Sequence, residues 1–431
     1  MNHTATVKLW GTVIGYLHLE EGKKTAAFEY DRAFVRMGIQ IAPIMMPLSN
    51  RVYVFPELAA TSFKGVPGLI ADSLPDKFGN AVIDQWLATQ GRTPDSFNVI
   101  ERLCYTGKRG MGALEYEPAM HAHIESEDQI SIAKLVEFSS AILQEKETQL
   151  LAAEDDVNYH QLLRLGTSAG GARAKAVISF NSETGDIRSG QIDLDESYEH
   201  WLMKFDGVSK NGDHNLEDVP EYTLIEYAYY KMALSAGIHM SECRLYEEGG
   251  RKHFMTKRFD RVAGKKRHMQ SLGAITHIDY DEPGLCSYEM AALMARRMGL
   301  PNADIEQLYR RMVFNVLAVN QDDHVKNISF LMDRKGVWSL SPAYDVTFAS
   351  DLNNKWLQAH QMTINGKRSN LTLEDIIACG QTMDLKPSKC KKIIEDVKTS
   401  VEAWASIARG VGIREKTIQG IQQELEKHRL V

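Results

Sequence analysis

Alternating apolar and polar positions near the start of the chain predict a β-hairpin. Within residues 5–20, hydrophobic side chains recur at every second position in two segments with two glycines between them, which is the period of strands that bury one face. Short segments of this kind continue to about Phe55. From Pro56 to Gln90 the pattern becomes mostly helical. A turn is predicted inside that region, at residues 74–80, because Pro, Asp, Gly and Asn occur there together.

Two later changes in the pattern divide the chain into three expected domains. The polar segment His121 to Asp128 is expected to be a linker that closes a first domain at residues 1–120. Residues 128–262 follow the order glycine-rich loop, strand, strand, helix, strand, strand, which suits a small β-rich lobe with one helix. A turn is predicted after the first of these strands, at Asn181 to Asp186. Residues 263–431 carry apolar stripes at helical spacing and are expected to form a mostly helical lobe.

Composition and charge narrow the class of protein. The chain has 431 residues, of which 44% are hydrophobic and 25% are charged, as in an ordinary globular protein with two or three domains. The five scattered cysteines lack a CxxC spacing and are expected to be reduced, as in a cytoplasmic protein. Neither a signal peptide nor an apolar run long enough to span a membrane is evident. The net charge of −7 argues against a protein that coats DNA unaided, although a local basic patch stays open.

A polar loop that follows a predicted helix carries the strongest chemical signal. Asp322 and Asn327 are five residues apart in this loop, and Asp345 lies 18 residues beyond Asn327. The intervening residues predict a hairpin, so Asn327 and Asp345 are expected to come together and share one Mg²⁺ ion. Phosphoryl transfer needs such a pair, together with a carboxylate that orients or deprotonates the acceptor hydroxyl, here Asp322. A capped polar loop without catalytic chemistry is the alternative interpretation.

Other residues of the same kind of site give weaker signals. His324 is more simply interpreted as a structural histidine that bonds the loop backbone than as a metal ligand. Small residues from Ser168 to Lys175 allow backbone N–H groups to approach phosphate oxygens, but a tight turn is the favoured interpretation of the segment alone because neither standard phosphate-loop pattern is present. Lys204, on a predicted strand, and Glu226, on the next helix, are a candidate phosphate-positioning pair or two surface charges.

These residues resemble the HipA family, the kinase toxins of bacterial toxin–antitoxin pairs, and the likeness covers nearly the whole chain. The motifs occur in the order expected for the family and are together highly specific. They are Leu69–Asp76, Gly110–Ala113, Ser168–Ala176, Lys257–Arg261, Asp322–Asn327 and Tyr344–Asp345. One departure is Ala174, which stands where many members have proline, so the phosphate loop is expected to be more mobile.

The resemblance implies an α+β, two-lobed protein-kinase-like fold with a small β-rich N-terminal subdomain and a mostly helical C-terminal lobe. It also implies an ATP- and Mg²⁺-dependent Ser/Thr kinase, with Asp322 as the catalytic residue and with Asn327 and Asp345 as metal ligands. Autophosphorylation at Ser168 would inhibit the enzyme, although the adjacent Thr167 leaves the modified residue open. The residues implied to contact ATP are Ala169, Gly170, Gly171, Ala172, Lys175, Lys204, Lys257, Phe259, His324 and Tyr344.

The same resemblance suggests partners for the protein. The expected partners are a HipB-like helix-turn-helix antitoxin, operator DNA bound indirectly through that antitoxin, and a protein substrate, with an aminoacyl-tRNA synthetase as one candidate. No membrane partner is expected. Two other functions stay open. One is a kinase that acts on a small molecule, and the other is a non-catalytic corepressor in an antitoxin–DNA complex.

Overall fold

The chain folds into two compact units. The structure is a computed structural model that describes residues 2–120, 131–143, 173–190, 194–208 and 221–429. Unit 1 comprises Met1–Ala42, Met46–Thr223 and Arg244–Met269, and unit 2 comprises Pro43–Met45, Leu224–Cys243 and Gln270–Val431. The expected linker at residues 121–128 falls outside the described residues.

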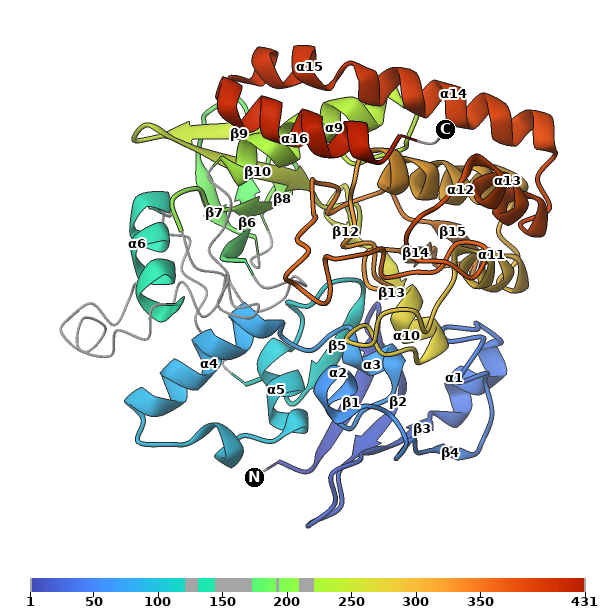
Figure 1. Cartoon of the computed structure of the whole chain (residues 1–431). Helices are drawn as coiled ribbons and strands as arrows, with labels where there is room; N and C mark the ends of the chain where they lie inside the picture. The colour runs from blue at the N-terminus through green and yellow to red at the C-terminus, as the bar shows by residue number, and fades with distance from the viewer. Residues whose placement is uncertain (1, 121–130, 144–172, 191–193, 209–220, 430–431) are drawn as a thin grey trace. The chain divides into compact units, whose positions relative to one another are not determined.

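An antiparallel sheet with the strand order β4-β3-β2-β1-β5 forms the first part of unit 1 (Figure 1). The predicted N-terminal hairpin is confirmed, because the first two strands pair with Thr4 opposite His18 and turn at Trp10 and Gly11, both with positive φ. Alternate residues of the first strand, Ala5, Val7 and Leu9, are buried. The strands are β1 (Thr4–Leu9), β2 (Thr12–His18), β3 (Ala27–Tyr30), β4 (Val52–Tyr53) and β5 (Leu114–Glu117).

Helices separate some of these strands along the chain, and two of the helices correct the sequence-based prediction. A helix occupies residues 32–37, where strand-like segments were expected, with Asp31 as its N-cap and Gly38 as its left-handed C-cap. Another helix begins at Lys77, inside the predicted turn, because the Asp76 carboxylate caps it by accepting the Gly79 N–H at 2.6 Å. The helices are α1 (Arg32–Met37), α2 (Ala60–Phe63), α3 (Gly68–Ala71), α4 (Lys77–Thr89) and α5 (Val99–Thr106), with a 3₁₀ turn at Pro94–Ser96.

A second antiparallel sheet, with the order β7-β6-β8-β10-β9, carries the rest of unit 1. Its core packs apolar residues of α4 and α6 (Ile132–Leu143) against the sheet, including Phe78, Val82, Leu135 and Trp201. The predicted turn after its first strand is confirmed, since the Asn181 side chain accepts the N–H groups of two turn residues. The strands are β6 (Lys175–Phe180), β7 (Ile187–Ser189), β8 (Glu199–Lys204), β9 (Cys243–Glu248) and β10 (Arg251–Lys257). Two short strands follow, β11 (Arg261–Val262) and β12 (Lys265–Lys266).

Unit 2 is mostly helical, as predicted, and α12 lies in its core (Figure 1). The expected apolar stripe on this helix is buried, and Gly380 of α13 approaches Tyr309 of α12 closely. The helices are α9 (Tyr222–Ser235), α10 (Leu272–Thr276), α11 (Tyr288–Arg297), α12 (Asn302–Leu317), α13 (Leu373–Thr382), α14 (Pro387–Glu402), α15 (Trp404–Val411) and α16 (Glu415–Lys427). Strands β13 (His268–Ser271), β14 (Ser329–Met332) and β15 (Trp338–Leu340) form a small sheet in that order.

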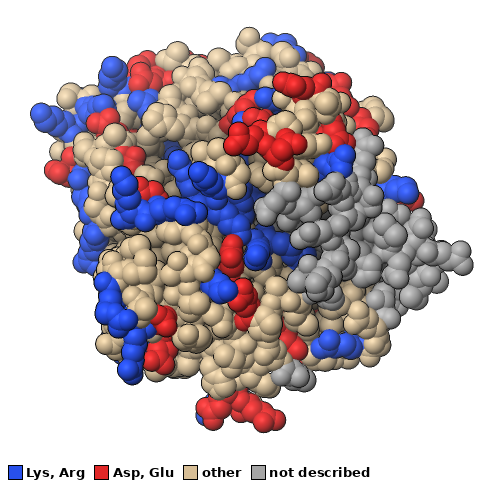
Figure 2. Space-filling view, turned by 180° about the vertical axis from the view of Figure 1, so that it is seen from behind, with Lys and Arg blue, Asp and Glu red and all other residues tan. Residues whose placement is uncertain are grey.

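The described residues show the state of the cysteines and the character of the helices. All five cysteines carry free, buried thiols. Among the helices that the structure describes, none has both the length and the apolar character that a membrane crossing requires. Figure 2 shows that both basic and acidic side chains reach the surface on this face of the molecule.

Candidate active site

The polar loop at residues 320–327 begins with a strained backbone at the end of α12. Val319 has a φ of 54°, in the left-handed region that β-branched residues rarely adopt. The Asn320 N–H donates to the Asn315 carbonyl at 2.9 Å, and the Val319 N–H donates to the Val316 carbonyl at 3.4 Å. This is the hydrogen-bond pattern of a Schellman motif, which usually has glycine at the position of Val319. The surrounding fold therefore holds the start of the loop in a conformation that its own residue disfavours.

Two adjacent aspartates of this loop have opposite environments. Asp323 is buried and accepts hydrogen bonds from the Tyr288 hydroxyl at 2.9 Å, the His360 ring at 3.0 Å and the Gln361 N–H at 2.7 Å. The Asp322 side chain is 42% exposed, and one of its carboxylate oxygens accepts from the Gln361 side-chain amide at 3.0 Å. Asp323 therefore anchors the loop, while Asp322 is held by Gln361 and presented toward solvent.

Sequence reasoning missed the residues that support Asp322. Tyr288, His360 and Gln361 lie 35 to 38 positions away from Asp323 along the chain, so no local pattern connects them. The one available signal was the doubled aspartate, because two adjacent carboxylates rarely share one role. The polar chain continues from Tyr288, whose hydroxyl accepts from Asn315 at 2.9 Å.

The predicted hairpin brings the two expected metal ligands to one cavity. Strands β14 and β15 pair with Phe330 opposite Leu340, and the Tyr344 hydroxyl donates to the Lys326 carbonyl at 2.5 Å. Asn327 and Asp345 directly follow these two bonded residues. Both line a cavity of about 20 Å³ that is also lined by His324 and Tyr344.

The donor atoms of this pair fit a magnesium ion. The Asn327 side-chain nitrogen donates to the Asp322 carbonyl at 2.8 Å, so its oxygen is the atom left to bind a cation. Asp345 has a φ of 54°, a second left-handed backbone at this site. Amide and carboxylate oxygens are the ligands that Mg²⁺ prefers, and this ion usually retains several waters. Among the described residues, no group of three or more His, Cys, Asp and Glu side chains is arranged to hold a metal, so a site here depends on the amide.

His324 makes the backbone contact expected of a structural histidine. Its Nδ1 atom accepts the Lys326 N–H at 3.2 Å, which places the proton of the neutral ring on Nε2. The Nε2 atom lies 3.9 Å from an Asp322 carboxylate oxygen. His324 therefore shapes the turn between Asp322 and Asn327 and also faces the catalytic candidate.

Unit 1 brings together two of the lysines expected to contact ATP. Lys175 and Lys204 lie opposite each other on β6 and β8, and both are buried. The Lys175 ammonium pairs with the Asp76 carboxylate at 3.1 Å, and the Lys204 ammonium lies 5.9 Å from the centre of the Phe254 ring. The two lysines expected to contact ATP phosphates therefore lie side by side, at the start of β6 and the end of β8.

Several other expected contacts lie elsewhere or outside the described residues. Lys257 forms an ion pair with Glu199 and lies opposite Trp201, at the other end of β8 from Lys204. Phe259 follows two residues later and is half-buried. Lys204 and Glu226 belong to different units, so their pairing stays a prediction. The residues that fall outside the described part of the chain are Ser168, Ala169, Gly170, Gly171 and Ala172, and the adjacent Thr167.

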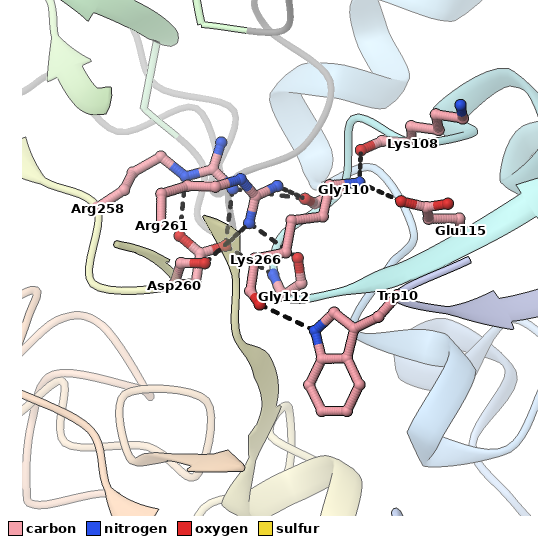
Figure 3. A network of polar contacts seen from close by, with 9 residues as sticks. All are labelled: Trp10, Lys108, Gly110, Gly112, Glu115, Arg258, Asp260, Arg261 and Lys266. Atoms are coloured by element: carbon pink, nitrogen blue, oxygen red, sulfur yellow. Dashed lines mark hydrogen bonds and ion pairs between the residues drawn. The ribbon is translucent and has the colours of Figure 1, made fainter. Parts of the chain in front are cut away.

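A buried charge network joins two of the motifs quoted from the sequence (Figure 3). Asp260 is fully buried and accepts from Arg258 at 2.9 and 2.7 Å, from Arg261 at 2.8 Å and from the Gly112 N–H at 2.7 Å. The two guanidinium groups also donate to the Gly110 carbonyl, at 3.4 and 3.0 Å. Burial alone would raise the pKa of Asp260, but the two arginines outweigh it and hold that pKa well below its ordinary value.

A lysine beside this network, Lys266, forms a hydrogen bond with the loop that contains Lys108. The Lys266 ammonium donates to the Lys108 carbonyl and to the Glu115 carboxylate, both at 2.7 Å. The backbone carbonyl of Lys266 accepts from the Trp10 indole at 2.9 Å. Gly112 has a φ of 73° and lies close to Met269. A Cβ atom added at Gly112 would lie 3.1 Å from the backbone nitrogen of Met269. The segment that ends in Arg261 is therefore fixed to the N-terminal part of unit 1.

Comparison with known protein families decides the relationship that these features suggest. The profile of the HipA N-terminal domain matches residues 5–117, and that of the HipA-like C-terminal domain matches residues 167–405. The chain belongs to the HipA family. A solved structure of HipA from Shewanella oneidensis MR-1, in a complex with HipB and operator DNA, matches with a TM-score of 0.66 and 15% identity. That match covers 98% of this chain and 96% of the other, and it confirms the predicted kinase-like α+β fold.

Two relatives found by sequence are named as candidate kinases. Y4dM from Sinorhizobium fredii is 29% identical over 189 residues, which are 39% of this chain and 42% of the relative. A protein from Haemophilus influenzae is 27% identical over 164 residues, which are 34% of this chain and 48% of that protein. The matched stretch therefore spans less than half the length of either relative.

Proposed function

We propose that this HipA-family chain is a kinase that transfers the γ-phosphate of ATP to a serine or threonine hydroxyl of another protein, with Mg²⁺ as cofactor. The convergence of Asn327 and Asp345 on one cavity, beside the loop of Asp322, is the observation that supports this proposal most. The kinase-like fold and the kinase names of both relatives point to the same chemistry.

The catalytic carboxylate in this proposal is Asp322. It accepts the proton of the acceptor hydroxyl while that oxygen bonds to the γ-phosphorus and the bond to the β–γ bridging oxygen breaks, which releases ADP. Its exposed side chain suits a group that meets a protein substrate, and its hydrogen bond from Gln361 restricts its orientation. Gln361 also donates through its backbone to Asp323, so the buried aspartate positions the exposed one through a shared partner.

Asn327 and Asp345 would hold the metal through their side-chain oxygens. Bound Mg²⁺ would neutralise charge on the β- and γ-phosphate oxygens. The Tyr344 hydroxyl supports both ligands, because it donates to the Lys326 carbonyl and also contacts the Ser329 hydroxyl on the strand that follows. A change in this tyrosine is therefore expected to alter metal affinity.

Nucleotide binding in unit 1 is proposed to follow β8. Lys175 and Lys204, at one end, would contact phosphate oxygens, and Lys257 with Phe259, at the other end, would contact the adenine. Lys204 and Trp201, the residue opposite Lys257, are three positions apart on β8, or about 10 Å at 3.3 Å per residue. That separation suits a nucleotide with its base at one end of the strand and its phosphates at the other.

Regulation and partners form the broader part of the proposal. We propose that the chain acts as a toxin restrained by a HipB-like antitoxin, through which it reaches operator DNA, and that phosphorylation of Ser168 or Thr167 switches it off. The solved relative in complex with HipB and DNA supports the partner, and the net charge of −7 agrees with indirect DNA contact. Mass spectrometry of the chain after incubation with ATP tests the modification, and absence of phosphate on both residues contradicts it.

Two substitutions at adjacent positions test the proposed chemistry. Asp322→Asn is expected to lower phosphate transfer by about 10²- to 10⁴-fold, because it removes the base, while the free energy of unfolding changes by about 0.5 kcal/mol or less. Asp323→Asn is the matched control, and it is expected to destabilise the fold by about 1.5–3 kcal/mol because it alters three buried hydrogen bonds to a carboxylate.

The assay is incorporation of labelled phosphate from ATP into lysate proteins, followed by identification of the labelled residue. Urea unfolding of each variant measures stability in parallel. Transfer by Asp322→Asn at the wild-type rate would contradict the assigned role. Label found in small molecules rather than in proteins would favour a metabolite kinase.

A further inference from the structure

A buried arginine on the wall of the proposed metal site has two unsatisfied donors. Arg311 of α12 is 7% exposed, and its Nη2 atom donates to the Ser341 carbonyl at 2.5 Å. Its Nε and Nη1 atoms are buried and have no hydrogen-bond partner among the described residues. Burial lowers the pKa of Arg311 to about 10, partly offset by Tyr344 and other neighbours. A guanidinium group remains charged at neutral pH, so these donors need an acceptor.

A second residue that lines the same cavity has an unsatisfied acceptor. The side-chain oxygen of Asn320 is buried and has no partner among the described residues, while its nitrogen donates to the Asn315 side chain at 3.0 Å. Arg311 and Asn320 both line the cavity that Asn327 and Asp345 line. The cavity has a volume of about 20 Å³, and roughly 10–15 Å³ is enough for one water molecule.

The chemistry of the wall selects water over an anion. The ligand has to accept from Arg311 and donate to the Asn320 oxygen, and a halide ion cannot donate. Two carboxylates, those of Asp323 and Asp345, belong to residues that line the cavity and would repel an anion. Water satisfies both kinds of group at once, as buried waters in proteins usually do.

We propose that this cavity holds one buried water molecule bound by Arg311 and Asn320, and that Arg311 thereby positions the segment that carries Asp345. The direct hydrogen bond from Arg311 holds Ser341, four residues before Asp345, and the water joins the same guanidinium to the first residue of the Asp322 loop. Arg311 is thus a positioning residue that links the two segments from which the metal ligands come. The positioning part rests on the proposed metal site, whereas the water site stands without it.

Crystal structures of the full chain test the water site directly. High-resolution density in the wild type is expected to show one water within hydrogen-bond distance of Arg311 and Asn320. Crystals soaked in bromide are expected to show no anomalous signal there. An empty cavity, or bromide in place of water, overturns the proposal whether or not any variant folds.

Metal binding without nucleotide tests the positioning role. Arg311→Met is expected to weaken Mn²⁺ binding to the full chain by about 10- to 100-fold, as loss of a group that orients metal ligands commonly does, and Arg311→Lys is expected to fall between this variant and the wild type. Arg310→Met is the matched control, because Arg310 lies on the same helix but bonds the Ala236 carbonyl and Asp396 instead, and it should bind Mn²⁺ as the wild type does.

The outcomes separate this inference from the proposed function. Equal Mn²⁺ affinity in Arg311→Met and the wild type, in folded proteins, refutes the positioning role. Mn²⁺ binding that is unaffected by Asn327→Ala refutes the proposed metal site, and with it the positioning role, while the density in the cavity still decides the water site.

Discussion

Replacement of Asp260 by asparagine removes the one buried carboxylate that two arginines share. Arg258 and Arg261 would then keep their charges beside a buried site that has lost its carboxylate. Breaking a buried ion pair from one side typically costs about 3–5 kcal/mol. Asparagine retains one acceptor oxygen, but its NH₂ group would face donors. Asp260→Asn is therefore expected to lower the free energy of unfolding by about 3–5 kcal/mol, a large share of the 5–15 kcal/mol typical of a protein.

Two measurements on the full chain locate this loss. Urea unfolding gives its size, and hydrogen exchange followed by mass spectrometry gives its place, with faster exchange expected at residues 108–113 and 258–267. Asp84→Asn is the matched control, since Asp84 pairs with Arg102 at 2.8 Å in a half-exposed position. This variant is expected to lower the free energy of unfolding by only about 0–1 kcal/mol. A loss below about 1 kcal/mol in Asp260→Asn, or unchanged exchange in both segments, would refute the reasoning.

The wild type and Asp260→Asn are expected to differ in their free energy of unfolding by an amount that depends on pH. This dependence follows from the lowered pKa of Asp260. A carboxylate whose folded pKa is depressed contributes stability that is fully present above the ordinary carboxyl pKa, about 3.9, and is lost as the pH falls below it. The difference between the wild type and Asp260→Asn should therefore stay constant from neutral pH down to about pH 4 and shrink only in stronger acid.

Three further predictions concern packing and burial. Gly380→Ala is expected to destabilise the protein by about 1–3 kcal/mol, because its Cβ atom would lie 2.4 Å from the Cys390 sulfur and 2.8 Å from Tyr309. Gly420→Ala, whose Cβ atom meets nothing within 4 Å, should be neutral or stabilising in the same urea experiment. Burial lowers the pKa of His268 to about 4, so its folded state binds fewer protons than the unfolded chain, and about 3 kcal/mol of stability should be lost as the pH falls from 6.5 to 4. Urea midpoints across that range check this, and a profile in His268→Gln as steep as that of the wild type contradicts it. The five buried thiols should react with a thiol reagent only upon unfolding, and rapid labelling of any of them in the folded protein would show the burial to be wrong.

The sequence predicted those parts of the fold that depend on nearby residues. The N-terminal hairpin, the turn after Asn181 and the hairpin between Asn327 and Asp345 each follow from patterns within about twenty residues. Helix α1 was missed although its caps were visible, because Asp31 and Gly38 enclose only six helical residues that also fit a strand. The start of α4 was misread because a Pro-Asp pair suits a turn and a helix cap equally well.

The residues that hold the candidate site in place could not be predicted from the sequence, for a physical reason. The Gly112 N–H and the Asp260 carboxylate are 148 positions apart, and a single sequence carries no sign of which distant polar groups will be buried together. The same holds for Asp323 and Gln361. The positions expected to touch the metal were placed by motif spacing, whereas the groups that hold them in place became visible only in three dimensions.

Helix α4 carries a consequence for any attempt to divide this protein. The helix falls within the match to the HipA N-terminal domain, yet its Phe78, Val82 and Leu87 are buried in one core with strands of the C-terminal match. Its cap Asp76 also pairs with the buried Lys175 of that second match. A fragment that starts after residue 120 would lose this cover and the ion pair between Asp76 and Lys175. The two domains that the family profiles name are therefore not expected to fold independently of each other.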